Sequence, residues 1–244
     1  MGRFEACFLD AYETIVHTDF GAHGHELLGL AGIPAEALYG GFRRVGPALS
    51  VGQISIAEAF GEILRAAGVE PKPDLVRALA DKSRELLLRS GRLYDDVLPF
   101  MRELRSRGIK IAVISNCDEN TRDLLVELGV AALADALILS NEVGVAKPAA
   151  QIYQIALDKL GVNAEAALFA DDNATYCAGA AALGIRAVQM IREPPDDVGG
   201  VRGARRTQRA RSAREVQGPR VNDEEEAMPG PPVVRSLPEL ETFL

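Results

Sequence analysis

Short apolar runs alternate with helix-like segments along most of the chain, and this alternation restricts the fold more than any other feature. The apolar runs are Ala6–Leu9, Ile109–Ile114, Ala136–Leu139, Ala166–Ala170 and Ile185–Ile191. Short, continuous runs of this kind are typical of strands buried on both faces. Segments with apolar residues at helical spacing follow or precede them: Val97–Arg107, Glu119–Leu128, Ala149–Leu160 and Thr175–Leu183. The pattern predicts an α/β fold with a Rossmann-like, three-layer core, in which helices cover both faces of a parallel sheet.

Residues 17–93 interrupt this alternation and have a helical pattern instead. Ser55 and Glu58 form a predicted capping box that opens an amphipathic helix to Ala67. Further helices are expected at Pro34–Val45 and Pro73–Arg89. Both ends of this insert return to the first strand, so we expect a helical cap over the core. The core itself is predicted to comprise residues 1–16, 94–192 and 236–244.

Residues 193–235 have a different character from the rest of the chain. Six arginines between Arg202 and Arg214 are followed by the acidic run Asp223–Glu226 and by prolines, without apolar periodicity. Such charge-segregated composition predicts a disordered loop. After it, Ser236–Leu244 has leucines and Phe243 at helical spacing, and we expect this segment to dock on the core.

The bulk composition narrows the range of partners. The formal net charge is −8 and aromatic residues make up 5% of the chain, which disfavours a general nucleic-acid binder. Neither an apolar run of the roughly 20 residues that span a bilayer nor a secretion signal is evident. The three cysteines are too scattered for a disulfide framework. These features predict a cytoplasmic protein without membrane or nucleic-acid partners; a homodimer is compatible with them.

Polar residues follow several of the predicted strands. In open parallel sheets, ligands bind at the carboxyl ends of the strands, so these residues are candidates for a site. The four informative loops contain Asp10-Ala11-Tyr12-Glu13-Thr14, Ser115-Asn116, Lys147-Pro148 and Asp171-Asp172-Asn173. Each is a weak signal alone, but their order and their shared position after strands make the set specific.

These residue types suit a covalent hydrolytic mechanism. A carboxylate nucleophile such as Asp10 divides a difficult displacement into two easier steps. The hydroxyl of Ser115 and nearby backbone N–H groups can bind phosphate oxygens. Asp171 and Asp172 add carboxylates, against Lys147 as the only clear cation. Several clustered carboxylates do not all stay ionised without help, and Mg²⁺ is a hard cation that carboxylates hold.

The four loops resemble the motifs of the haloacid dehalogenase-like (HAD) superfamily, subfamily IA with a helical C1-type cap. The resemblance covers about residues 4–192 and the final helical segment. It implies that Asp10 attacks the substrate and becomes a covalent ester, and that Ser115 binds the transferred group. It also implies that Lys147 orients the nucleophile, and that Asp10, Asp171 and Asp172 hold Mg²⁺.

The first motif departs from the family's phosphatases. Those enzymes carry a second Asp as general acid and base where this chain has Tyr12, and a phenol with a pKa near 10 is a poor base at neutral pH. Asp-Ala-Tyr followed by Thr14 also resembles the first motif of the family's 2-haloacid dehalogenases, and Asn116 is compatible with that function. The acidic pair after the fourth strand is phosphatase-like instead. Glu13, where the family usually has Gly, adds charge beside the nucleophile.

The sequence therefore predicts a hydrolase, with three functions left open. The first is Mg²⁺-dependent hydrolysis of a small phosphomonoester, with Asp10, Tyr12, Thr14, Ser115 and Lys147 as candidate catalytic residues. The second is metal-independent dehalogenation, and the third is a weakly active or non-catalytic binding protein. Ser115 and Asn116, with Arg43 and Arg44 of the cap, are candidate contacts to an anionic substrate.

Overall fold

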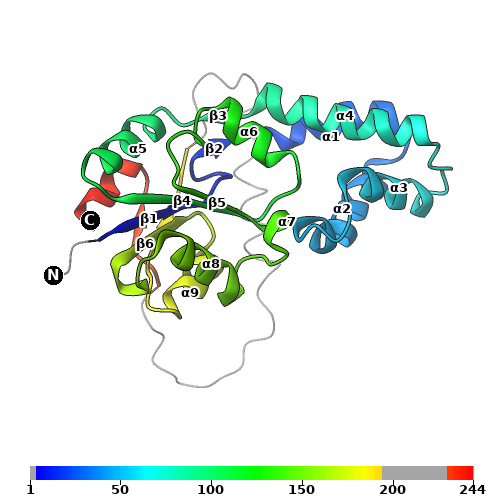
Figure 1. The fold of residues 1–244 in the computed structure, drawn as a ribbon. Coiled ribbons are helices and arrows are strands. Elements are labelled where there is room, and N and C mark those ends of the chain that lie inside the picture. Colours follow the sequence, from blue (N-terminus) through cyan, green and yellow to red (C-terminus); the bar gives the residue numbers. More distant parts are fainter. Residues whose placement is uncertain (1–3, 194–229, 244) are drawn as a thin grey trace. The chain divides into compact units, whose positions relative to one another are not determined.

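A sheet of parallel strands forms the centre of the structure, a computed structural model that describes residues 4–193 and 230–243 (Figure 1). In this part of the chain, the six strands follow the order β5-β4-β1-β6-β7-β8, and every neighbouring pair is parallel. The strands are β1 (Ala6–Leu9), β4 (Lys110–Ser115), β5 (Ala136–Leu139), β6 (Ala167–Asp171), β7 (Arg186–Met190) and β8 (Val233–Val234). The predicted parallel sheet is confirmed. Strands β1, β4, β5, β6 and β7 begin and end within two residues of the predicted bounds.

Helices cover both faces of this sheet, as the alternating pattern predicts (Figure 1). One face is covered by α5 (Val97–Ser106), α6 (Thr121–Glu127) and the 3₁₀ helix η2 (Leu237–Thr242), and the other by α8 (Ala150–Leu160) and α9 (Ala174–Ala181). Two short elements, α7 (Ser140–Val143) and η1 (Ala164–Ala166), lie in the connections. The sheet therefore forms the middle of three layers.

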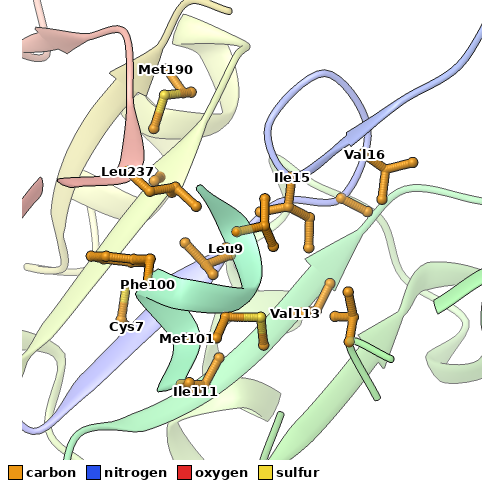
Figure 2. Close-up of a cluster of buried hydrophobic side chains, with 14 of the residues drawn as sticks. Cys7, Leu9, Ile15, Val16, Phe100, Met101, Ile111, Val113, Met190 and Leu237 are labelled. Atoms are coloured by element: carbon orange, nitrogen blue, oxygen red, sulfur yellow. The ribbon is translucent and has the colours of Figure 1, made fainter. Parts of the chain in front are cut away.

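Successive residues of β1 serve the two layers in turn, because strand side chains alternate between faces. Cys7 and Leu9 pack with Phe100 and Met101 of α5 in one apolar cluster (Figure 2). The alternate residues Ala6 and Phe8 join the opposite cluster around α8. All residues of β1 are fully buried, which fits a strand at the centre of the sheet.

The insert between β1 and β4 is helical and has its own apolar cluster. It contains a two-stranded antiparallel ribbon of β2 (Val16–His17) and β3 (Arg92–Leu93), and the helices α1 (Phe20–Ala31), α2 (Ala35–Ser50), α3 (Ile56–Ala66) and α4 (Pro73–Ser90). The predicted capping box of Ser55 and Glu58 is present at the start of α3. Leu38, Phe60 and Leu79 are buried among these helices.

Two parts of the insert differ from the expectation. No helix was predicted at Phe20–Ala31, where three glycines weaken the intrinsic helix propensity; packing of Leu27 and Ala31 into the apolar cluster of the insert outweighs it. The second helix continues beyond the predicted end at Val45 to Ser50, with Pro47 inside it.

The C-terminal segment corrects one predicted boundary. Val233 and Val234, which fall within the charged loop predicted over 193–235, form β8 and pair with Gln189 and Met190 of β7. The arginine-rich and acidic tract at 194–229 lies outside the described residues. Beyond β8, the leucines of η2 are fully buried in the same cluster as Cys7. Among the described helices, none is both long and apolar enough to cross a membrane.

We expect the C-terminal segment to contribute measurably to stability. Leu240 is fully buried, so Leu240→Ala should lower the free energy of unfolding by about 2–5 kcal/mol, through lost burial and the cavity left behind. Val233→Ala is the control, because Val233 is 51% exposed and should cost no more than about 1 kcal/mol. Urea denaturation measures both, and equal midpoints for the two variants would show that η2 does not stabilise the core.

Candidate active site

The register of the sheet brings the first and last motifs together. Leu9 at the end of β1 pairs with Val113 of β4 and with Ala170 of β6. The next residues along the three strands, Asp10, Ile114 and Asp171, therefore lie side by side at the carboxyl edge. The backbone N–H of Asp10 donates to the carbonyl of Ala170 at 2.9 Å, which fixes this alignment.

Lys147 lies between the two carboxylates and binds both. Its Nζ donates to Asp10 Oδ1 at 2.5 Å and to Asp171 Oδ2 at 2.6 Å. A third bond runs to the carbonyl of Ile114 at 2.9 Å. An ammonium group has three donors, so all three are used. The side chain of Lys147 is 1% exposed, and each N–H donor of this buried charge has an oxygen acceptor.

Burial and charge act in opposite directions on these groups. Burial raises the pKa of Asp10 above its ordinary value; Lys147 opposes this rise, and the Asp171 carboxylate adds to it. For Lys147, burial lowers the pKa, but the Asp10 and Asp171 carboxylates outweigh burial and raise it overall. The ammonium therefore stays charged at neutral pH. One ammonium does not offset all the nearby carboxylates, and a further positive charge would favour the ionised nucleophile.

Three carboxylates form a cluster that could supply this extra charge by holding a cation. Asp10, Asp171 and Asp172 each offer an oxygen, and these oxygens all lie within 4.8 Å of one another. Asp10 and Asp171 are buried, and Asp172 is half-buried. Oxygen donors at this spacing fit a hard divalent cation such as Mg²⁺, which is typically held by one or two carboxylates and by substrate oxygens.

Two hydroxyl groups of the first two motifs are buried without a partner among the described residues. Ser115, the last residue of β4, is fully buried and its Oγ has no hydrogen bond there. The same holds for Oγ1 of Thr14. A buried hydroxyl without a partner costs stability. A ligand oxygen that reached Ser115 would therefore gain a donor already stripped of water.

Asn116 holds the loop that carries Lys147. Its Nδ2 donates to the backbone carbonyl of Lys147 at 2.9 Å, and the backbone N–H of Lys147 donates to Asn116 Oδ1 at 2.7 Å. This reciprocal pair fixes the lysine backbone opposite β4. The structure thus gives Asn116, predicted as a substrate contact, a positioning contact to the lysine loop.

Tyr12, predicted among the catalytic residues, is held by packing and by a hydrogen bond. Its hydroxyl lies 2.8 Å from Thr121 Oγ1, and its ring contacts Phe20 with centroids 5.6 Å apart. Burial raises the pKa of the phenol further above its ordinary value. A phenol that stays protonated and is bound to Thr121 is a poor proton acceptor at neutral pH.

Glu13 occupies a backbone conformation that favours glycine. Its φ is 57°, in the left-handed region that other residues adopt rarely. Its carboxylate lies 3.4 Å from His17 Nδ1 and accepts a bond from the Tyr94 hydroxyl at 3.4 Å. The acid therefore interacts with the ribbon at the base of the insert, through β2 and the residue after β3.

A cavity of about 450 Å³ adjoins the first two motifs. On the core side it is lined by Tyr12, Asn116, Cys117 and Asp118. On the side of the helical insert it is lined by Phe20, His23, Gly24, Leu27, Leu38, Tyr39, Phe42, Leu49, Ile56, Ser83 and Leu87. Arg43 and Arg44, predicted to contact an anionic substrate, are exposed on α2 and do not belong to this lining.

Two further residues at the strand ends escaped the sequence analysis. Arg192, two residues after β7, donates to the Thr14 carbonyl at 2.9 Å and forms a bidentate ion pair with Asp96. Ser140 follows β5, and its Oγ accepts the Cys117 N–H at 2.9 Å. Both occupy the position after an apolar run, so the rule that found Asp10 and Ser115 could have found them.

The family assignment follows from a match over most of the chain. Residues 4–184 match the family model of haloacid dehalogenase-like hydrolases, and the chain belongs to this family. The family model describes hydrolases, and the relatives that the chain matches are named as phosphatases and as dehalogenases. The subfamily, inferred from the helical insert, stays a prediction.

Two curated relatives illustrate this division. Phosphatase MT3486 of Mycobacterium tuberculosis (strain CDC 1551 / Oshkosh) is 34% identical over 121 residues, which cover 47% of this chain and 56% of that protein. (S)-2-haloacid dehalogenase 1 of Pseudomonas sp. (strain CBS-3) is 28% identical over 206 residues, covering 79% and 86%. The chain spans about half the length of the first curated relatives that it matches.

The fold is shared with solved structures. L-2-haloacid dehalogenase from Xanthobacter autotrophicus, with chloropropionic acid covalently bound, superimposes with a TM-score of 0.65 at 22% identity. The alignment covers 99% of each chain. At this identity the similarity establishes the α/β fold.

We expect Lys147 to be essential for stability because its ammonium group forms ion pairs with two buried carboxylates. Lys147→Met should lower the free energy of unfolding by about 3–5 kcal/mol, since it leaves uncompensated buried charge. In an Asp10→Asn, Asp171→Asn background the same change should cost much less. Lys159→Met is the control, because Lys159 is exposed on α8. Equal costs in both backgrounds, measured by urea denaturation without added metal, would contradict the pairing.

Proposed function

We propose that this protein is a Mg²⁺-dependent hydrolase of small phosphomonoesters, with Asp10 as its covalent nucleophile. The observation that carries the proposal is the excess of carboxylates in the cluster of Asp10, Asp171 and Asp172 over the single ammonium of Lys147. A metal-free site would gain nothing from a third carboxylate beside the nucleophile. The formal net charge of −8 supports a small-molecule substrate over nucleic acid.

The first chemical step would form a phosphoaspartate. Asp10 Oδ1 is bound to Lys147, which leaves Oδ2 to attack phosphorus. As the new O–P bond forms, the ester O–P bond breaks and the leaving alkoxide takes a proton from solvent. Ser115 would donate its unpartnered hydroxyl to a phosphoryl oxygen. Mg²⁺, when held by the carboxylate cluster, would offset charge on the phosphoryl group.

The second step would return Asp10 to its carboxylate form. Water attacks phosphorus, the bond between phosphorus and the Asp10 oxygen breaks, and both protons of the water leave with inorganic phosphate as dihydrogen phosphate or pass to solvent. A general base normally assists such an attack and contributes roughly 10²–10⁴-fold in rate. Because the Tyr12 phenol is bound to Thr121, we expect slow turnover compared with a phosphatase that has this base.

Dehalogenation of a 2-haloacid is the second candidate. It is supported by Tyr12, because Asp-Ala-Tyr resembles the first motif of the dehalogenases. The packed phenol of Tyr12 also leaves no acid–base group at that position. In that reaction Asp10 would displace halide from carbon, and water would then cleave the ester. Two features weigh against it: the acidic pair of Asp171 and Asp172, and a cavity of about 450 Å³, within the size range of drug-like ligands.

The metal requirement is the direct test of the proposal. Millimolar Mg²⁺ should raise the melting temperature and be required for phosphomonoester hydrolysis, because a ligand of the folded state stabilises it. Asp172→Asn should remove both effects, whereas Asp158→Asn, at an exposed position on α8, should keep them. Asp10→Asn should abolish turnover without loss of fold. Halide release from 2-haloacids that needs no metal would favour the second candidate.

Tyr12→Asp distinguishes the two candidates by the sign of its effect. In a phosphatase that lacks its general base, the new carboxylate should raise turnover, by at most about 10²–10⁴-fold. In a dehalogenase, the same carboxylate would repel the anionic substrate beside Asp10 and weaken its binding. Tyr12→Phe is the matched control, because it removes only the hydroxyl bound to Thr121. A fall in phosphatase rate for Tyr12→Asp, with Tyr12→Phe unchanged, would contradict the phosphatase proposal.

A further inference from the structure

The cap side of the cavity is built from one face of each of its helices. Phe20, His23, Gly24 and Leu27 recur at the spacing of a single α1 face. The remaining cap residues of the lining come from α2, the start of α3 and α4: Leu38, Tyr39, Phe42, Leu49, Ile56, Ser83 and Leu87. Most of these side chains are aliphatic or aromatic. A ligand portion in this cavity therefore meets a largely apolar surface.

The charges on the lining do not suit an anionic group. Among the described residues that line the cavity, none is Lys or Arg. Asp118 is acidic, and its Oδ1 accepts the Asn120 N–H at 2.9 Å. Burial lowers the pKa of His23, so this imidazole is neutral at neutral pH. A carboxylate or second phosphate placed here would lose water without gaining a cation, which is costly.

We propose that the alcohol portion of the substrate is uncharged and largely apolar, and that this cavity binds it. The inference rests on the proposed phosphomonoester hydrolysis at Asp10 and specifies its substrate class. The phosphoryl group would lie at the carboxylate cluster, and the hydrocarbon portion would extend past Tyr12 into the cap. Phe20 and Tyr39 are 53% and 39% exposed and leave the apolar lining accessible from solvent.

Gly24 lines the cavity beside Tyr39 and offers a way to alter the lining. A Cβ added at Gly24 would lie 1.9 Å from the Tyr39 hydroxyl oxygen, so any larger residue must displace the Tyr39 ring. Gly29, on the same helix, offers a matched position, because a Cβ there meets nothing within 4 Å. Gly24→Ala and Gly29→Ala are the same chemical change with the same gain in helix propensity. Only the first alters the lining.

The first experiment compares esters of one phosphate group with different alcohols, in the presence of Mg²⁺. From ethyl to butyl to hexyl phosphate, kcat/KM should rise by about threefold to fourfold per methylene until the cavity is filled. 3-Phosphoglycerate, whose alcohol portion carries a carboxylate, should be a poorer substrate than butyl phosphate. Gly24→Ala should lower kcat/KM for hexyl phosphate by about tenfold or more, and by a clearly smaller factor for ethyl phosphate. Gly29→Ala should match wild type on both.

A binding measurement separates this inference from the proposed function. Benzyl alcohol, followed by saturation-transfer NMR on the intact chain, should bind the wild type and Gly29→Ala and bind Gly24→Ala more weakly. If no phosphomonoester is hydrolysed but this pattern appears, the proposed function is wrong and the apolar site remains. If esters are hydrolysed but 3-phosphoglycerate exceeds hexyl phosphate, or both glycine variants behave alike, the inference is overturned.

Discussion

The site depends on the ion pairs that the Lys147 ammonium group forms with two buried carboxylates. This ammonium group is almost fully buried, and it is tolerated because Asp10, Asp171 and the Ile114 carbonyl accept hydrogen bonds from its three N–H donors. Those three partners lie on adjacent strands, so the sheet register must be correct before the ion pairs form. Asn116 also restrains Lys147, because its side-chain amide hydrogen-bonds both the N–H and the carbonyl of the lysine backbone. A small error in any of these elements would leave a charge buried alone, which is strongly destabilising.

The single positive charge of Lys147 does not balance the carboxylates around it. Lys147 offsets part of the charge of Asp10, Asp171 and Asp172, and burial still raises the pKa of Asp10. A nucleophilic carboxylate must be ionised, so a bound cation is the natural complement. Tyr12 adds no proton acceptor here because its hydroxyl is bound to Thr121. In the proposed mechanism, these groups would serve nucleophilic attack and charge stabilisation, with little provision for proton transfer.

Under the proposed function, the core and the helical insert would divide substrate recognition between charge and shape. The strand ends supply carboxylates, one ammonium and buried hydroxyls, whereas the cap adds mainly apolar side chains to the adjoining cavity. Contacts between core and cap hold the two together: Glu119 accepts the Ile56 N–H at the start of α3, and Arg84 pairs with Asp123. A ligand with one charged end and one apolar end is complementary to this arrangement.

The sequence by itself determined the α/β core, the order of its strands along the chain and several of the polar residues that meet at the carboxyl ends of these strands. Buried parallel strands appear in the sequence as short apolar runs. The polar loops after these runs identified Asp10, Ser115, Lys147 and the acidic pair as candidates. The tertiary structure alone decided which groups meet. It tied Asn116 to the lysine loop, left Arg43 and Arg44 on the surface and formed β8 from Val233–Val234. Pairing, helix rotation and cavity lining depend on contacts between distant segments, which local periodicity does not encode.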